Sequence, residues 1–219
     1  MRTTNGRAEI LRAARDTFAR KGFDGASIRD IAQEAGLSLS ALYYYFPSKQ
    51  DALYELIRDA YTWYIEHAQS VVEAAGDSVP DRVALLVRFI VRYRTRNTLI
   101  SRVVLRDTER LDPERFDDIH GLQRASRAVL YDLIAVGRTD GTFPVVDAEI
   151  AGRAVLAITN AIPLWYREGG SITAATLEEQ YVVYALRLLG WQEIDAPGTV
   201  ERLLALPLAE TGEVGYVAA

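Results

Sequence analysis

Apolar side chains recur every three or four positions along most of this chain, which is the spacing that places them on one face of an α-helix. No segment shows a convincing strand-like alternation of apolar and polar residues. The expected fold class is therefore all-α. The predicted long helices run over about residues 7–21, 49–75, 80–94, 99–110, 112–138, 147–167 and 173–189.

Two short helices and a tight turn are predicted between the first two of these helices. Ser27 can cap the first short helix, and Gly36 follows it where the backbone must take a positive φ, which glycine does without steric cost. Ser38 can cap the second short helix, which carries Leu42 on its inner face and ends at Pro47. This is the layout of a helix-turn-helix, in which the second helix enters the major groove of DNA.

The first fifty residues resemble the DNA-binding domain of the TetR family of transcriptional repressors. The resemblance is carried by Ala14, Phe18, Gly22 and Phe23, by Ser27 with Ile28-Arg29-Asp30-Ile31-Ala32, by Ala35-Gly36-Leu37-Ser38, by Leu42-Tyr43-Tyr44-Tyr45-Phe46, and by Ser48-Lys49. It implies a ligand-responsive repressor that binds palindromic, double-stranded operator DNA as a homodimer. It also implies DNA contacts at Ser27, Ser38, Leu39, Ser40, Tyr43, Tyr44, Tyr45 and Lys49.

The same resemblance divides the chain into three parts. Residues 1–48 form a three-helix DNA-binding head, and residues 49–190 form a helical effector-binding and dimerisation domain. Residues 191–219 are expected to be a loosely ordered C-terminal extension, because proline and glycine are dense there and only residues 199–206 look helical. The helix that starts at residue 49 belongs to head and body alike, so a tilt at one end should move the other.

Composition fits a globular protein and limits the possible classes. The chain has 219 residues, a formal charge of −5 and no cysteine, which excludes disulfides and thiolate metal sites. Residues 1–54 contain eight basic and six acidic side chains, so the expected DNA-binding end is the more basic one. The sequence predicts neither a membrane span nor a signal peptide, and we expect the protein to be cytoplasmic.

The three consecutive tyrosines cannot all be buried on one helical stripe, because successive residues lie about 100° apart. An aromatic cluster normally belongs to a core, but here at least one ring must project outward and can contact DNA. Lys49 is open to two interpretations, a solvated surface lysine or a DNA phosphate ligand. Since residues 37–46 lack Arg, Asn and Gln, base recognition would rest on hydroxyls, apolar contacts and DNA shape.

The body contains many large aromatic residues at positions that look interior, and the resemblance implies an effector pocket among its middle helices. The candidate pocket residues are Tyr61, Tyr64, Phe89, Tyr93, Tyr131 and Trp165. Positive charge is concentrated on Arg92, Arg94, Arg96, Arg102 and Arg106, which form either a solvated face or a site for an anionic effector. Residues 165–170 are similar to a segment of actinobacterial relatives that sense acyl-CoA or steroid-derived CoA thioesters. A hydrophobic effector with a carboxylate or CoA group is therefore expected.

The alternative function is a helical small-molecule-binding protein or enzyme that retains the head. No catalytic triad or phosphate-binding glycine loop can be assembled, and His120 near Asp117 and Asp118 is better explained by a polar helix face than by a metal. No metal or cofactor is expected. A dimer is expected to form through the helices at about 147–168 and 173–189. The apolar residues expected to carry it include Ala151, Ala154, Val155, Ile158, Ile162, Val182, Ala185 and Leu189.

Overall fold

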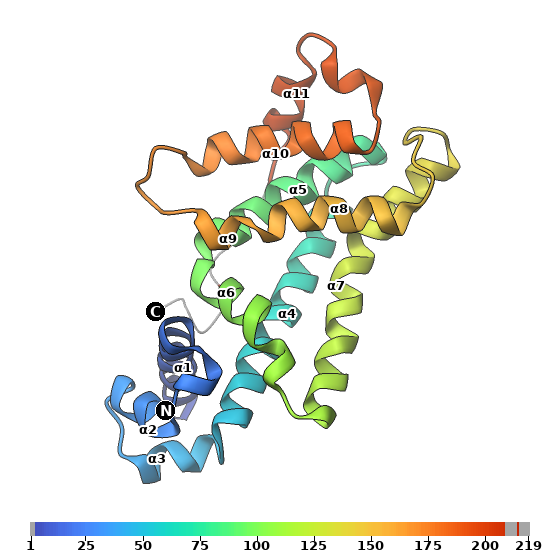
Figure 1. The fold of residues 1–219 in the computed structure, drawn as a ribbon. Coiled ribbons are helices and arrows are strands. Elements are labelled where there is room, and N and C mark those ends of the chain that lie inside the picture. The colour runs from blue at the N-terminus through green and yellow to red at the C-terminus, as the bar shows by residue number, and fades with distance from the viewer. Residues whose placement is uncertain (1–2, 209–213, 215–219) are drawn as a thin grey trace. The chain divides into compact units, whose positions relative to one another are not determined.

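The computed structural model describes residues 3–208 and residue 214. It confirms the all-α fold class (Figure 1). The α-helices are α1 (Thr3–Gly25), α2 (Ile28–Glu34), α3 (Leu39–Tyr45), α4 (Lys49–Glu73), α5 (Val79–Arg96), α6 (Thr98–Asp107), α7 (Pro113–Thr139), α8 (Ala148–Asn160), α9 (Ile162–Trp165), α10 (Ala174–Leu188) and α11 (Thr199–Ala205). Two 3-10 helices, η1 (Thr108–Arg110) and η2 (Gln192–Asp195), complete the described elements.

The chain forms two compact units that do not follow the order of the sequence. The first comprises the described residues of Met1–Trp63, Asn97–Gln123 and Gly212–Ala219, and the second those of Tyr64–Arg96 and Arg124–Thr211. Helices α4 and α7 each contribute residues to both units. These units are defined by compactness and do not test the expected functional division at residue 48, which stays a prediction.

In the first unit, α6 packs against α1 and holds the point where α1 bends. Helical geometry in α1 breaks at Gly22, whose φ is 73°. Near this break the Arg106 guanidinium donates to the carbonyl of Phe18 at 2.6 Å, and the buried Asp107 carboxylate accepts the amide of Phe23 at 3.5 Å. Side chains of α6 therefore fix the C-terminal end of α1, which directly precedes the helix-turn-helix.

In the second unit, α5 is the central element. Every residue from Val83 to Val91 is buried, because α10 lies along one side of α5 and α8 and α9 pack against it as well (Figure 1). This burial corrects one sequence expectation. The residues Ala151, Val155, Ile162, Val182, Ala185 and Leu189 are buried inside the protomer and are not a free face for a partner.

Two element boundaries also differ from expectation. The helix expected over 147–167 ends at Asn160, and the short α9 follows, because Pro163 has no amide hydrogen to continue the first helix. Residues 191–208 are not a loose extension, since Trp191, Ile194 and Leu203 are buried and α11 contacts α5 and α10. Residues 209–213 and 215–219 of the expected extension lie outside the described residues.

Candidate nucleic-acid interface and effector site

Helices α2 and α3 form a helix-turn-helix whose caps are built as the sequence predicts. The Asp30 amide donates to the Ser27 hydroxyl at 3.1 Å, while the Ser27 amide donates to the Asp30 carboxylate at 2.9 Å. This reciprocal capping box fixes the start of α2. Gly36 follows α2 with a φ of 65°, and Ser38 caps α3 by accepting the amide of Ala41. The turn therefore sets the direction in which α3 leaves.

The rotation of α3 about its axis is fixed by Leu42, which is fully buried, and by Phe46 just after the helix. The opposite face is consequently exposed: the side chain of Tyr44 is 81% exposed and that of Tyr43 is 45% exposed. Ser40 lies on the same face, because positions 40, 43 and 44 are three or four residues apart. This face offers hydroxyl groups and aromatic rings to whatever binds α3.

Tyr45 is oriented differently from its two neighbours. A Cβ atom built on Gly6 of α1 would lie only 2.8 Å from the Tyr45 hydroxyl oxygen, so the ring packs against α1. Its ring also meets the ring of Tyr44 edge-on, with centroids 5.3 Å apart. Leu39 is half-buried. The candidate contacts therefore separate into the exposed Ser27, Ser38, Ser40, Tyr43 and Tyr44 and the partly covered Leu39 and Tyr45.

Of the two interpretations of Lys49, the structure contradicts the solvated surface lysine, because the side chain is turned toward the head. Its ammonium donates to the carbonyls of Phe23 and Ala26 at 2.9 Å and 3.0 Å, and it lies 4.2 Å from the centroid of the Phe23 ring. The ammonium finds its partners in the carbonyls after the bend of α1, so it needs neither solvent nor phosphate. Lys49 ties the N-terminus of α4 to the end of α1, and DNA contact by its third hydrogen stays a prediction.

The structure brings three of the six candidate effector residues together. Tyr64, Phe89 and Tyr93 are buried side by side, with ring centroids 5.2–6.4 Å apart. Tyr131 lies instead where α7 crosses Gly152 of α8, a contact that a Cβ atom at Gly152 would block.

The other two candidates lie elsewhere. The side chain of Trp165 is 43% exposed and meets Tyr166 edge-on, and Tyr61 lies on the part of α4 that belongs to the first unit. The six aromatic residues that suggested a single effector pocket therefore lie at several separate places.

The arginines of α5 and α6 bind other elements of the protein. Arg92 donates to the Glu178 carboxylate at 2.6 Å, Arg94 to the Asn160 side chain at 2.7 Å, and Arg106 to the carbonyl of Phe18. Arg92 and Arg94 hold α10 and α8 to α5. Arg106 holds α1 to α6 and pairs with Asp107, while its side chain stays 47% exposed.

His120, the histidine considered for a metal site, packs against an aromatic ring. The His120 ring stacks on the Phe116 ring with centroids 5.8 Å apart, which gives this histidine a packing role. Over residues 3–208 and 214, three His, Asp or Glu side chains are nowhere placed so that they could hold a metal ion. The helices described in that range are too short or too polar to cross a membrane.

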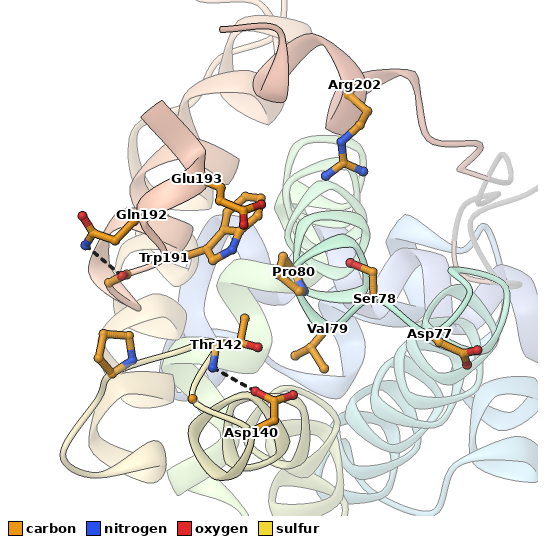
Figure 2. A pocket seen from close by; sticks show the side chains of 13 residues that line it. Asp77, Ser78, Val79, Pro80, Asp140, Thr142, Trp191, Gln192, Glu193 and Arg202 are labelled. Atoms are coloured by element: carbon orange, nitrogen blue, oxygen red, sulfur yellow. Dashed lines mark hydrogen bonds between the residues drawn. The ribbon is translucent and has the colours of Figure 1, made fainter. Parts of the chain in front are cut away.

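Sequence reasoning missed a cavity in the second unit. Its lining comes from the start of α5, the turn after α7, the link after α10, and α11 (Figure 2). The first two segments lie far from the others in the chain, and none of the four carries a binding motif. Helical periodicity gave no signal that could have found the cavity, because it reports on helix faces and says nothing about which turns meet.

Comparison with known families decides the class of the protein. Residues 10–56 match the family described as bacterial regulatory proteins, tetR family, and residues 76–189 match the tetracyclin repressor-like C-terminal domain. The chain belongs to the TetR family. It is therefore a helix-turn-helix transcriptional regulator of the repressor type and not an enzyme.

Individual relatives agree with this placement in the TetR family. The HTH-type transcriptional repressor KstR2 of Mycolicibacterium smegmatis is 28% identical over 183 residues, which is 82% of this chain and 88% of that repressor. The solved structure of the ketosteroid transcriptional regulator KstR2 of Mycobacterium tuberculosis is similar, with a TM-score of 0.76, 26% identity, and coverage of 85% of this chain and 95% of that one.

A third structure, AibR in complex with isovaleryl coenzyme A and operator DNA, shares the fold. Its TM-score is 0.75 at 20% identity, covering 82% of this TetR-family chain and 97% of that one.

Proposed function

We propose that this TetR-family regulator is a homodimeric repressor that binds a palindromic operator through α3 and is released by a hydrophobic, anionic effector. The observation that carries the DNA-binding part is the exposed face of α3, formed by Ser40, Tyr43 and Tyr44 opposite the buried Leu42. Operator DNA lies in the bacterial cytoplasm, and we place the protein there.

Recognition by α3 would rest on short polar and aromatic groups. Tyrosine and serine hydroxyls can donate to phosphate oxygens, and ring edges can pack on thymine methyl groups. Bidentate base contacts require Arg, Lys, Asn, Gln or a carboxylate, and Leu37–Phe46 contains none of these. We therefore expect DNA shape to contribute to operator choice, and phosphate contacts to make binding strongly dependent on salt.

We place the dimer interface on the outer faces of α8 and α10. Ile150 of α8 is 68% exposed, and Tyr184 and Leu188 of α10 are also exposed although both are large and apolar. An isologous interface would pair these helices with the same helices of a second copy and cover the apolar surface. The interface would then consist of the residues that the core of the protomer leaves free.

The effector part rests on the aromatic cluster and on the relatives. Tyr64, Phe89 and Tyr93 form a buried aromatic cluster in the second unit, which is the kind of apolar environment that a hydrophobic effector would enter. KstR2 is named for a ketosteroid and AibR was solved with isovaleryl coenzyme A, which supports a hydrophobic effector linked to CoA or ending in an acid. The arginines support it less, because three of them already bind protein groups.

Helix α4 is the element that we expect to couple the two events. It carries Lys49 in the first unit and Tyr64 in the second without interruption. An effector that favours a different position of α4 would weaken DNA binding by the same free energy by which DNA weakens effector binding.

The DNA-binding proposal is tested with a duplex selected from a random library, labelled for fluorescence anisotropy. We expect Tyr44→Ala to weaken binding about tenfold or more, the size of one lost base or phosphate contact. Leu105→Ala, which truncates an exposed apolar side chain on α6, is the matched control and should bind normally. Equal affinity of the two variants, or failure to select any DNA at low salt, would contradict the proposal.

The effector proposal is tested on the same protein–DNA complex. Isovaleryl-CoA, longer acyl-CoAs and steroid acids are titrated in, with free CoA and a neutral steroid as controls. We expect at least one of the anionic compounds to release the DNA. If only the neutral steroid released the DNA, a hydrophobic effector site would still be supported, but the proposal of an anionic effector would be refuted.

A further inference from the structure

The cavity in the second unit has a volume of about 600 Å³, which lies within the range of roughly 300–1,000 Å³ typical of small-molecule sites. Its wall is formed by Asp77–Pro80 at the start of α5, by residues 140–142 with Pro144 after α7, by Gly190–Glu193 after α10, and by Arg202 of α11. Figure 2 shows Trp191, Glu193, Arg202 and Asp140 arranged around the same space.

Charge in and beside this cavity is negative on balance. The positive charge of Arg202 is already matched, because Asp81 accepts two hydrogen bonds from its guanidinium at 2.8 Å and 2.9 Å. Arg82, beside the cavity, lies 3.4 Å from the Asp77 carboxylate. Asp140 and Glu193 carry the two negative charges in excess, and Glu193 also attracts the Arg202 guanidinium.

The backbone around the cavity contributes partial charges of both signs. The turns that follow α7 and α10 line the cavity, and so does the start of α5 with Ser78, Val79 and Pro80. A helix carries about half a negative charge at its C-terminus and about half a positive charge at its N-terminus, so the excess of negative charge comes from the side chains. Thr142 donates hydrogen bonds to the Asp140 carboxylate and lowers its pKa, so this group is ionised at neutral pH.

The apolar part of the wall comes from Val79, Pro80, Pro144 and Trp191. Gly190, next to Trp191, has a φ of 76° and leaves no room for a Cβ atom beside Pro144. Trp191 and Glu193 both line the cavity, and most of the Trp191 side chain is buried. A tryptophan face and a carboxylate together attract a cation that is only weakly hydrated.

We propose that this cavity binds an organic cation, that is, an amine, amidine or quaternary ammonium group attached to an aromatic or alkyl body. An anion would meet the carboxylates of Asp140 and Glu193, and would find the Arg202 guanidinium already paired with Asp81. A bare metal ion is disfavoured, because no three acidic or histidine side chains of the described residues converge on one point. This site is separate from the effector site proposed above and does not depend on it.

The probe for the experiment is benzamidine, which carries a cationic amidine on an aromatic ring. Calorimetric titration of the full chain should give saturable binding that weakens as salt is added. Benzyl alcohol and benzoate have a similar size without the positive charge, and we expect neither to bind measurably. Absence of saturable benzamidine binding, or tighter binding of benzoate, would overturn the proposal.

Variants then locate the site. Asp140→Asn and Glu193→Gln should each weaken benzamidine binding by about three- to tenfold, the effect of removing one charge near the surface. Asparagine can still accept the amide of Thr142 at this position, so the turn should keep its shape. Glu168→Gln removes the same charge from an exposed position outside the cavity and should bind as the unmodified protein does. Equal affinity in all three variants would place the ligand elsewhere and refute the site.

Discussion

At the scale of single residues, the ammonium of Lys49 is the contact that best shows how the head is held together. Lys49→Met removes two hydrogen bonds from a charged donor and leaves the carbonyls of Phe23 and Ala26 without them. We expect a loss of about 1.5–3 kcal/mol in the free energy of unfolding, measured by urea denaturation. Lys21→Met, which breaks only a surface pair with Asp30, should cost less than about 1 kcal/mol. Equal losses of unfolding free energy in the two variants would show that the Lys49 hydrogen bonds stabilise the protein no more than a surface ion pair does.

Asp30 gives the head a specific response to acid. Hydrogen bonds from Lys21 and from Ser27 lower the pKa of its carboxyl from 3.8 to about 2. A depressed folded-state pKa stabilises the protein above the unfolded value, and that stabilisation is lost as the pH falls from about 4 towards 2. The difference in melting temperature between the protein and Asp30→Asn should therefore be present at pH 6 and shrink across this window. A difference in melting temperature that does not change with pH would show that the effect of Asp30→Asn comes from packing and not from the charge.

At the scale of elements, the apolar outer faces of α8 and α10 determine the expected assembly. Leu188→Glu and Tyr184→Glu should halve the mass measured by light scattering while leaving the helix content unchanged, because both side chains are exposed in the protomer. Leu105→Glu on α6 should leave the mass unaltered. Ala185→Glu should unfold the protein, since Ala185 is fully buried. Dimers that persist in both α10 variants would place the interface elsewhere.

At the scale of the whole chain, a buried ionic network joins segments more than eighty residues apart. Glu178 of α10 accepts from Arg88 and Arg92 of α5, and Arg88 also donates to the carbonyls of Leu203 and Leu206. Burial lowers the pKa of Arg88, so this guanidinium depends on its partners. Through Arg88 the network ties both α10 and α11 to α5.

Removal of Glu178 should consequently be costly. Glu178→Ala leaves Arg88 buried beside Arg92 without the carboxylate, and we expect a loss of about 3–5 kcal/mol in denaturant unfolding. Glu149→Ala removes an exposed carboxylate that pairs with Arg153 one turn away, and should cost less than about 1 kcal/mol. Similar losses for the two variants would mean that solvent reaches and screens the network.

The sequence by itself determined what depends on local order along the chain. Helical periodicity gave the all-α class and most helix boundaries, because side chains three and four residues apart share a face. Ser27, Gly36, Ser38 and Leu42 fixed the helix-turn-helix and the outward direction of Tyr44, since caps, turns and helix phase act over a few residues only. These signals were enough to reach the family.

Only the tertiary structure decided which distant groups meet. It turned the side chain of Lys49 onto carbonyls 23 and 26 residues earlier, and it buried Ala185 against α5 instead of leaving it for a partner. It also brought three separate turns and α11 together to make a cavity. A helical pattern shows that a residue faces something apolar, but it does not show whether that neighbour belongs to the same chain or to another. The contacts between helices and turns supply that information, because they are set by the packing of the whole core.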